Sequence, residues 1–132
     1  MADYITDIIR RYEADLYKVK LYGYDLQYVE EQTPELCLAA VKQNATSVYY
    51  VKEQTPELCL AAVKQNASSV YYVKEQTPEI CLEAVKQDGR ALEFVKKQTA
   101  EICLAAVKRF GHVLKYVKDL ELKEQIRLQL NL

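Results

Sequence analysis

The sequence predicts an all-α fold, a right-handed solenoid of short helical hairpins. The chain has 132 residues and repeats itself every 22 residues, with the clearest copies marked by Thr33, Thr55, Thr77 and Thr99. Each copy contains a helix start signal, a short apolar stretch and then a second apolar stretch. Helices this short are not stable alone in water, so neighbouring copies must stack to bury their apolar faces.

Several residue types obey the same period. The four cysteines occupy one column, at Cys37, Cys59, Cys81 and Cys103. The three glycines occupy another, at Gly23, Gly89 and Gly111. The glycine column begins one copy early, which indicates a degenerate repeat before the clear ones. We therefore expect one domain over residues 1–132 with five repeats. Its expected parts are an N-terminal capping helix plus degenerate repeat at 1–31, repeats at 32–53, 54–75, 76–97 and 98–119, and a C-terminal capping helix at 120–132.

The first helix of each repeat has a clear start. In the second repeat, Thr33 is a suitable N-cap, Pro34 suits the first helical position, and Glu35 favours the positive end of the helix dipole. The stretch LCLAAVKQ then places apolar side chains over a wide arc of the helix. Such an arc suits a helix that has neighbours on two sides.

The turn and the second helix follow from the next columns. Glycine in the turn column predicts a left-handed residue that ends the first helix. The copies with Ala45 and Ala67 should then carry strain, or shift the left-handed residue to Asn44 or Asn66. The stretch TSVYYVKE predicts a second helix, because no hairpin turn follows it. The columns that contain Val48, Tyr50 and Val51 are expected in the core.

Both ends of the chain are expected to cap the stack. Residues 3–22 predict one long amphipathic helix, with apolar positions at Tyr4, Ile5, Ile8, Ile9, Tyr12, Leu16 and Val19. Residues 120–130 break the column pattern and predict a last helix. Terminal units of solenoids present a polar outer face, and we expect both ends to do so.

Composition and charge limit the functions that the chain can have. The formal net charge of −1 gives no global attraction to nucleic acid or anionic lipid. No apolar run approaches the roughly 20 residues that cross a bilayer. The acidic N-terminus lacks the pattern of a secretory signal. We therefore expect a cytoplasmic protein in a reducing compartment.

The cysteine column is expected to be buried and inert. Equivalent residues of stacked helices lie about 10 Å apart, which is too far for a disulfide bond. The short cysteine spacings of zinc sites are absent. The single histidine, His112, has no cysteine on a matching face, and no catalytic motif is present. The sequence therefore predicts no enzymatic activity, no metal and no cofactor.

Charged residues form ladders with the same period. One glutamate column begins at Glu13, and lysine columns begin at Lys20 and Lys52. A lysine ladder could follow a phosphate backbone. However, the hairpin geometry should place Lys52 near Glu57 and Lys74 near Glu79, which favours a solvated lattice of ion pairs over a nucleic-acid site.

Two tyrosines point to a binding surface. Tyr49 and Tyr71 occupy a column that holds Gln27, Glu93 and Lys115 in other repeats, so the column should face water. Tyr24, in the neighbouring column, is expected beside them. Exposed tyrosine is enriched at protein interfaces. The candidate partner-binding surface is Tyr49, Tyr71, Tyr24, Glu93 and Lys115. In the alternative interpretation, the two tyrosines lie flat over their own core.

The stretch TPEICLEAVKQDGRALEFVKKQT resembles the DUF4116-type tandem helical repeat, a domain of unknown function found in bacterial and giant-virus proteins. Its units read approximately E-[IV]-C-L-x-A-V-K-Q-N-G-x-A-L-x-[YF]-V. The resemblance covers residues 32–119 well and 10–31 weakly, and it departs from the family at Ala45 and Ala67, where glycine is usual. It implies a helical repeat and assigns no catalytic or binding residue.

The expected function is a non-enzymatic protein–protein interaction module. A small viral or bacterial effector or inhibitor that binds one host protein fits this expectation, and the ends of the stack could support self-association. There are two alternatives. One is a nucleic-acid-binding repeat protein that uses its lysine columns. The other is an engineered repeat scaffold without a natural partner, which the near-identity of the second and third units allows.

Overall fold

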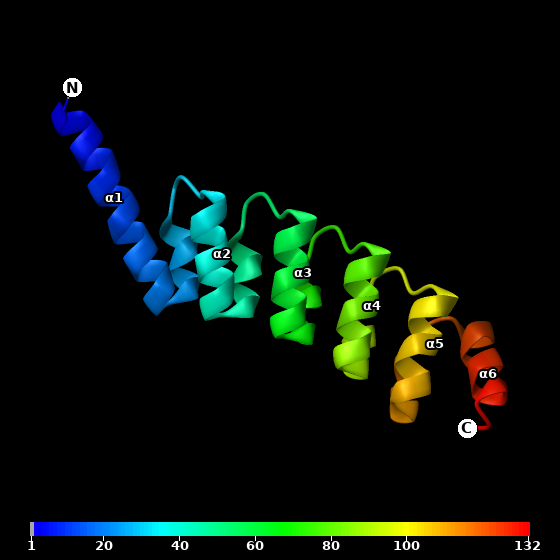
Figure 1. The fold of residues 1–132 in the computed structure, drawn as a ribbon. Helices are drawn as coiled ribbons and strands as arrows, with labels where there is room; N and C mark the ends of the chain where they lie inside the picture. Colours follow the sequence, from blue (N-terminus) through cyan, green and yellow to red (C-terminus); the bar gives the residue numbers. More distant parts are fainter. Residues whose placement is uncertain (1) are drawn as a thin grey trace.

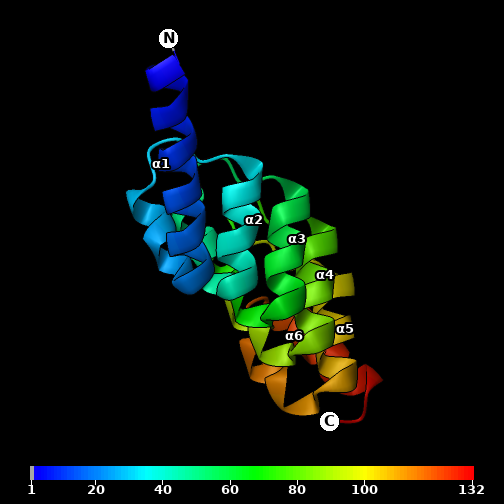
Figure 2. The same ribbon diagram turned by 60° about the vertical axis from the view of Figure 1, so that its left-hand side comes forward.

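The computed structural model describes residues 2–132 and confirms the all-α solenoid (Figure 1). Six α-helices alternate with five 3₁₀-helices, and the described residues contain no strand. The elements are α1 (Ala2–Leu21), η1 (Gly23–Tyr28), α2 (Pro34–Gln43), η2 (Ala45–Tyr50), α3 (Pro56–Gln65), η3 (Ala67–Tyr72), α4 (Pro78–Gln87), η4 (Gly89–Phe94), α5 (Ala100–Arg109), η5 (Gly111–Tyr116) and α6 (Leu120–Gln129). The α-helices form one layer and the 3₁₀-helices the other, and linkers run from each 3₁₀-helix to the next α-helix (Figures 1 and 2).

The α-helices begin as the sequence predicts. The hydroxyl of Thr33 accepts a hydrogen bond from the amide of Leu36 at 3.2 Å, and Pro34 occupies the first helical position. Thr55, Thr77 and Thr99 cap α3, α4 and α5 in the same way. Each cap satisfies a backbone donor that the helix itself leaves without a partner.

The second helix of each hairpin is a 3₁₀-helix of six residues and ends earlier than predicted. In the second repeat it closes with a bond from the Val51 amide to the Val48 carbonyl at 3.1 Å, and Val51 itself is extended. Val48 and Val51 are buried, as expected. The aromatic column is not core, because Tyr50 is only half-buried and Tyr28 is exposed.

The predicted left-handed turn is wrong. Asn44 ends α2 in an extended conformation, with φ −151° and ψ 113°, and its side chain accepts a hydrogen bond from the amide of Thr46 at 3.1 Å. Among the described residues, Asn131 alone has a positive φ. Asn44 thus ends one helix and caps the next without a left-handed residue, so Ala45 adds no strain.

Close packing explains the small residues of the turn column. A β-carbon on Gly23 would lie 2.4 Å from the Ala40 carbonyl oxygen and 2.5 Å from the Ser47 hydroxyl. A β-carbon on Gly89 would lie 2.7 Å from the ring of Phe110 in the next repeat. The column therefore selects small side chains because neighbouring repeats approach closely there, and not because of backbone conformation.

A column of glutamines, which no sequence motif marks, ties the repeats together. The side-chain amide of Gln54 donates to the carbonyls of Val48, at 2.9 Å, and Tyr72, at 3.0 Å. Its oxygen accepts from the amide of Lys74 at 2.9 Å and from the thiol of Cys59 at 3.7 Å. We call this arrangement the glutamine clamp, and the same pattern recurs at Gln32, Gln76 and Gln98.

The core runs through all five repeats. Its recurring members are the Leu or Ile, Cys, Ala and Val of α2 to α5, such as Leu36, Cys37, Ala40 and Val41, together with two apolar residues from each 3₁₀ segment, and α1 contributes Val19. Two buried hydroxyls, those of Ser47 and Ser69, have no hydrogen-bond partner. Ala91 and Val113 replace them in the later repeats, so the column does not require a polar group.

Terminal helices flank the repeats, but the N-terminal one does not present a polar outer face. The C-terminal half of α1 packs as the α-helix of the first repeat, where Val19 is buried. The N-terminal half projects beyond the stack (Figures 1 and 2), and Ile5, Ile8 and Ile9 are exposed there. At the other end, α6 packs against α5 through Ile126.

Replacing Gln54 with alanine should destabilise the fold by about 3 kcal/mol, because it leaves two carbonyls and one amide at a repeat junction without partners. Urea unfolding followed by circular dichroism measures this loss. Gln65→Ala is the matched control, since the exposed Gln65 donates one bond, to the Lys42 carbonyl at 3.2 Å. Equal losses in the two variants would contradict the clamp.

Gly23→Ala should lower the free energy of unfolding by about 1–3 kcal/mol, because the added methyl group overlaps the Ala40 carbonyl. Gly111→Ala serves as the control, since its β-carbon would meet the Leu132 side chain at 3.5 Å, an ordinary contact. The control should retain or slightly increase stability. The same urea titration compares the two, and a harmless Gly23→Ala would disprove the packing explanation.

Candidate functional site

Six aromatic rings form a continuous row along the 3₁₀ layer. Successive rings meet edge to face in the order Tyr24, Tyr50, Tyr49, Tyr72, Tyr71 and Phe94, with centroid distances from 5.0 to 5.7 Å. We call this the aromatic row. It runs from η1 to η4 and therefore spans four repeats. Each edge-to-face contact adds about 0.5–1.5 kcal/mol beyond area burial, so the rings hold one another in place.

The three tyrosines of the predicted surface lie in this row and face solvent. Tyr49 and Tyr71 are each 59% exposed, and Tyr24 is 45% exposed. The hydroxyl of Tyr24 is paired with that of Thr46 at 2.7 Å. The rings lean against their neighbours, yet more than half of Tyr49 and Tyr71 remains open to solvent.

Glu93 and Lys115 continue the exposed column beyond the last ring of the row. Both are exposed, and the ammonium group of Lys115 lies 5.2 Å from the ring centre of Tyr116. In the later repeats they occupy the position of Tyr49 and Tyr71, so the exposed side chains at this position are charged in η4 and η5. The structure thus groups Tyr24, Tyr49 and Tyr71 and leaves the two charged residues at one end.

Three members of the row were not predicted to reach the surface. Tyr50, Tyr72 and Phe94 were assigned to the core, but they are half-buried and supply the rings between which Tyr49 and Tyr71 stand. The Tyr-Tyr pairs at 49–50 and 71–72 were the available signal. On a 3₁₀-helix, adjacent residues point about 120° apart, so one ring of a pair packs inward while the other faces outward.

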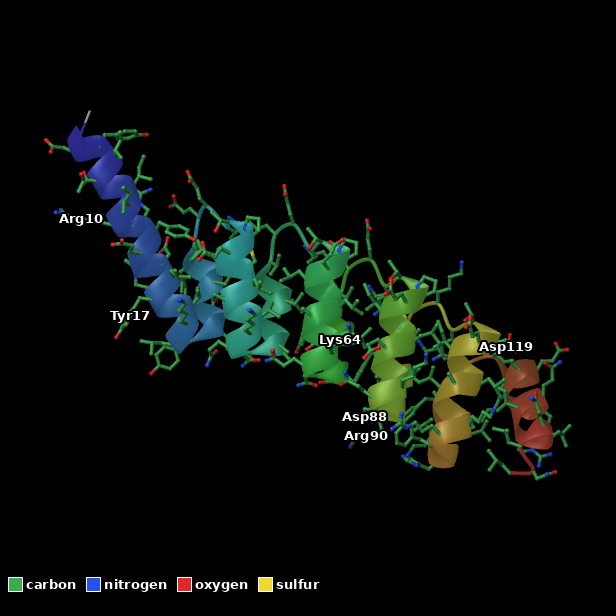
Figure 3. The ribbon with its side chains drawn as sticks, in the orientation of Figure 1. Arg10, Tyr17, Lys64, Asp88, Arg90 and Asp119 are labelled. Atoms are coloured by element: carbon green, nitrogen blue, oxygen red, sulfur yellow. The ribbon has the colours of Figure 1, made fainter. Side chains whose placement is uncertain are left out.

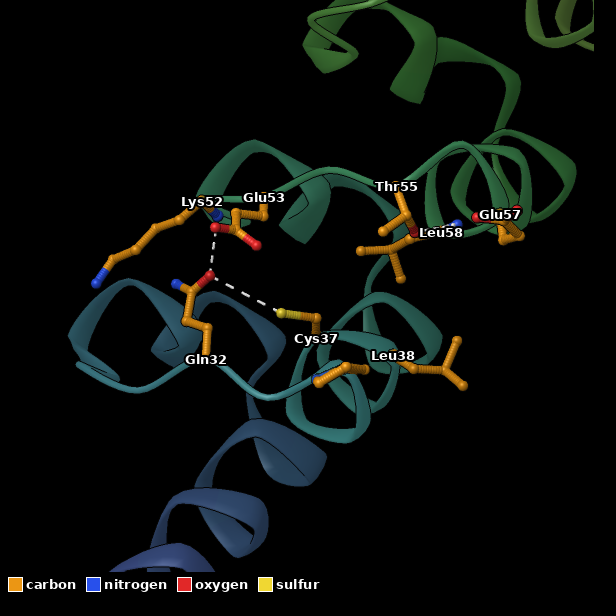
Figure 4. Close-up of a pocket in the computed structure, with 9 residues that line it drawn as sticks. Gln32, Cys37, Leu38, Lys52, Glu53, Thr55, Glu57 and Leu58 are labelled. Atoms are coloured by element: carbon orange, nitrogen blue, oxygen red, sulfur yellow. Dashed lines mark hydrogen bonds between the residues drawn. The ribbon is translucent and has the colours of Figure 1, made fainter.

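A groove of about 500 Å³ lies between α2 and α3, as the close-up in Figure 4 shows. Its apolar lining includes Pro34, Leu38 and Leu58, and its polar lining includes Gln32 and Lys52. Gln32 accepts hydrogen bonds there from the Lys52 amide, at 2.9 Å, and from the thiol of Cys37, at 3.8 Å. The helices α2 and α3 have identical sequences, and no residue at this junction departs from the repeat pattern in a way that indicates a groove.

The expected lattice of lysine–glutamate pairs is wrong. Within residues 2–132 the ion pairs are Asp88–Arg90, at 2.7 Å, and Glu124–Arg127, at 2.6 Å. Lys52 instead donates to the Glu30 carbonyl at 3.0 Å. These two ion pairs hold the pKa of Asp88 and of Glu124 below their ordinary values, in each case mainly through the hydrogen bond from the arginine.

Lysines and glutamates instead gather at opposite ends of the α-helices. The last turns of α2 to α5 carry Lys42, Lys64, Lys86 and Lys108, and the first turns carry Glu35, Glu57, Glu79 and Glu101. Within one helix the two sets are seven residues apart, as Glu35 and Lys42 are, which corresponds to about 10 Å along the helix axis. Figure 3 shows Lys64 on α3, and Asp88 with Arg90 beyond the end of α4. Both charge ladders complement the helix dipoles.

All four cysteines are buried and free, as expected. Burial raises the pKa of each thiol, and that of Cys59 rises to about 11. Across the described part of the chain, no cluster of three or more histidine, cysteine, aspartate or glutamate residues is placed to hold a metal ion. His112 is exposed, with its ring edge-on to Phe110 at 6.4 Å. No helix within residues 2–132 has the length and apolar character of a membrane span.

The family model described as a domain of unknown function (DUF4116) matches residues 55–99 and again residues 77–123. The two matches are offset by one repeat of 22 residues, and together they cover more than half of the chain. The chain belongs to the DUF4116 family. No curated protein and no solved structure matches it at a significant level. In this DUF4116 protein, the matched region includes the η3 and η4 part of the aromatic row and two of the four clamp glutamines, Gln76 and Gln98.

The buried thiols should resist labelling in the native protein. With a pKa of about 11 against an ordinary value of 9.0, Cys59 has roughly 100-fold less thiolate than an exposed cysteine at pH 8. A thiol-reactive chromophore should therefore modify the folded chain slowly and all four cysteines rapidly in denaturant. Rapid labelling of the folded chain would show that the cysteine column opens to solvent.

Proposed function

We propose that this DUF4116 protein is a non-enzymatic interaction module that binds a protein partner along the aromatic row. The row itself is the observation that supports the proposal. It places two tyrosines that are 59% exposed on adjacent repeats and supports each ring by its neighbours. A small viral or bacterial effector or inhibitor that binds one host protein is the context that suits such a module.

Preorganisation makes the row suited to binding. Side chains that are mobile before binding lose rotamer freedom in a complex, at a cost of about 0.5–1.5 kcal/mol each. Tyr49 already stands between Tyr50 and Tyr72, at 5.0 and 5.3 Å, so less of that freedom remains to be lost. Tyrosine also offers a large apolar ring and a hydroxyl for hydrogen bonding. The row therefore combines the features of an interface hot spot.

The regular spacing of the row indicates an extended contact. From Tyr49 to Tyr71 the rings advance by one repeat through two contacts, of 5.3 and 5.0 Å, by way of Tyr72. A partner that follows the row would thus meet one exposed ring per repeat. Solenoids bind in this manner because they present long, regular faces.

Nucleic-acid binding is the second candidate, and one observation favours it. Lys42, Lys64 and Lys86 are exposed at one edge of the stack, and none is paired with a carboxylate among the described residues. A phosphate backbone could follow this ladder at one lysine per repeat. The net charge of −1 and the absence of aromatic rings from this lysine ladder make it the weaker candidate.

The double variant Tyr49→Glu, Tyr71→Glu should lose the partner while remaining folded. Glutamate already occupies this column at Glu93, so the fold accepts it. If each tyrosine is a hot spot worth about 2 kcal/mol, affinity should fall about 30-fold for one replacement and up to about 1,000-fold for both. A tagged pull-down from host-cell lysate, at low and high salt, identifies the protein retained by the wild type, and titration with that purified protein measures the loss.

Tyr17→Glu is the matched control. Tyr17 is 68% exposed and lies on α1, outside the row (Figure 3). Its replacement should leave affinity unchanged. A partner that the double variant retains fully would exclude the aromatic row. Recovery of nucleic acid that salt removes, and that the double variant still binds, would favour the lysine edge instead.

A further inference from the structure

The N-terminal half of α1 leaves large apolar side chains exposed at Tyr4, Ile5, Ile8 and Ile9. The helix has 20 residues, whereas α2 to α5 have ten each. Its second half belongs to the first repeat: Val19 is buried, Leu16 packs against the core, and the hydroxyl of Tyr12 donates a hydrogen bond to Glu35. Its first half extends away from the repeats (Figures 1 and 2).

The projecting half carries an exposed apolar stripe. Tyr4 is 69% exposed, Ile5 53%, Ile8 47% and Ile9 51%. Spacings of three and four residues place these side chains on one face of the helix. The same face continues into Tyr12, Leu16 and Val19, which pack on the stack. We call the four exposed residues the α1 stripe. It is a continuation of an established helix–helix interface that lacks its second helix.

We propose that a second copy of this chain covers the α1 stripe. The two projecting helices pair antiparallel about a two-fold axis near Asp7, and the chain forms a dimer. In this arrangement Ile5 of each copy lies opposite Ile9 of the other, and Ile8 lies close to the axis. The interface is therefore isologous, which is the commonest way for identical chains to associate.

A second copy fits better than other parts of the protein. A helix that covers the stripe must offer an apolar face of similar length. At the opposite end of the stack, the exposed Leu120 and Leu128 of α6 are eight residues apart, and Glu124 lies midway between them, in an ion pair with Arg127. That face is interrupted by charge, whereas the α1 stripe contains none and is complementary to itself.

Dipole and shape agree with antiparallel pairing. Asp7 and Arg11 lie one turn apart on one flank of the stripe. The axis brings the Asp7 carboxylate towards that of the second copy, and the Arg11 of each chain, one turn away, offsets this charge. The helix dipoles also oppose one another. Ten residues of projecting helix span about 15 Å, so the two repeat stacks lie at opposite ends of the pair and do not collide.

Sedimentation velocity over a range of concentrations tests the proposal on the full chain. The wild type should reach a dimer, and Ile5→Gln with Ile9→Gln should sediment as a monomer where the wild type is dimeric. Both side chains are exposed and glutamine forms helices well, so circular dichroism should show the variant folded. Leu120→Gln with Leu128→Gln is the matched control at the other end, and it should remain dimeric.

Three outcomes would overturn the proposal. The wild type could be monomeric at every concentration, the α1 variant could remain dimeric, or the α6 variant could dissociate, which would indicate head-to-tail contact between the two ends of the stack. The wild-type dimer together with a monomeric α1 variant and a dimeric α6 variant would support it.

Disulfide trapping tests the direction of the helices. Ile8→Cys lies near the axis and should form a covalent dimer on oxidation. Tyr12→Cys should not, because antiparallel pairing separates the two copies of residue 12 by about 15 Å along the helix axis, beyond disulfide reach. The four native cysteines are buried and do not compete. Efficient trapping at residue 12 would indicate a parallel pair and disprove the antiparallel arrangement.

Discussion

The glutamine clamp is the interaction on which the rest of the structure depends. A 3₁₀-helix of six residues leaves carbonyl groups without partners at its end, and in η1 to η4 this end meets the next repeat. One side chain, that of Gln76 for example, donates to two of these carbonyls and accepts from the next linker amide at 2.9 Å. Both carbonyl bonds are part-buried, and a carbonyl left unpaired away from water costs about 1–3 kcal/mol. The clamp thus sets the register between repeats, and the apolar columns pack within it.

The glutamine clamp also explains why each repeat carries a cysteine. Each thiol lies 3.7 to 4.0 Å from the oxygen of the glutamine five residues before it in the chain. Cysteine is small, apolar and a weak donor, which suits a site that has both a packed wall and a spare acceptor. Valine would fill similar space without the S–H group, and serine would add a more strongly hydrated hydroxyl. The column is therefore structural in the described repeats, even though a cysteine in every copy first suggests chemistry.

The repeat period and the helix caps could be predicted from the sequence, because both follow from local residue patterns. Features that depend on contacts between neighbouring repeats could not. Thr33 and Pro34 mark a helix start by local chemistry alone, so the α-helices were predicted correctly. The turn was not, because Gly23 is required by the Ala40 carbonyl of the next repeat, a contact that no local pattern encodes. Tyr49 and Tyr71 were correctly expected to face solvent, because other repeats carry polar residues at the same position. Tyr50 was misplaced because a 3₁₀-helix rotates each residue by about 120°, and its ring is shared between core and surface.

The aromatic row and the α1 stripe, the two surfaces proposed for binding, lie where the chain departs from its 22-residue repeat pattern. The clamped repeats contribute stability and no specificity, as expected for a stack in which each unit contacts its neighbours. The row exists because two repeats carry paired tyrosines, and the α1 stripe exists because one helix continues beyond its repeat. If the stripe pairs two chains, the stacks lie at opposite ends and each keeps its own row exposed. A dimer would then bind a partner that has two sites with an avidity that neither row has alone, provided that the partner spans both stacks. The rigidity of the clamped repeats would fix that span, so geometry as well as affinity would select the partner.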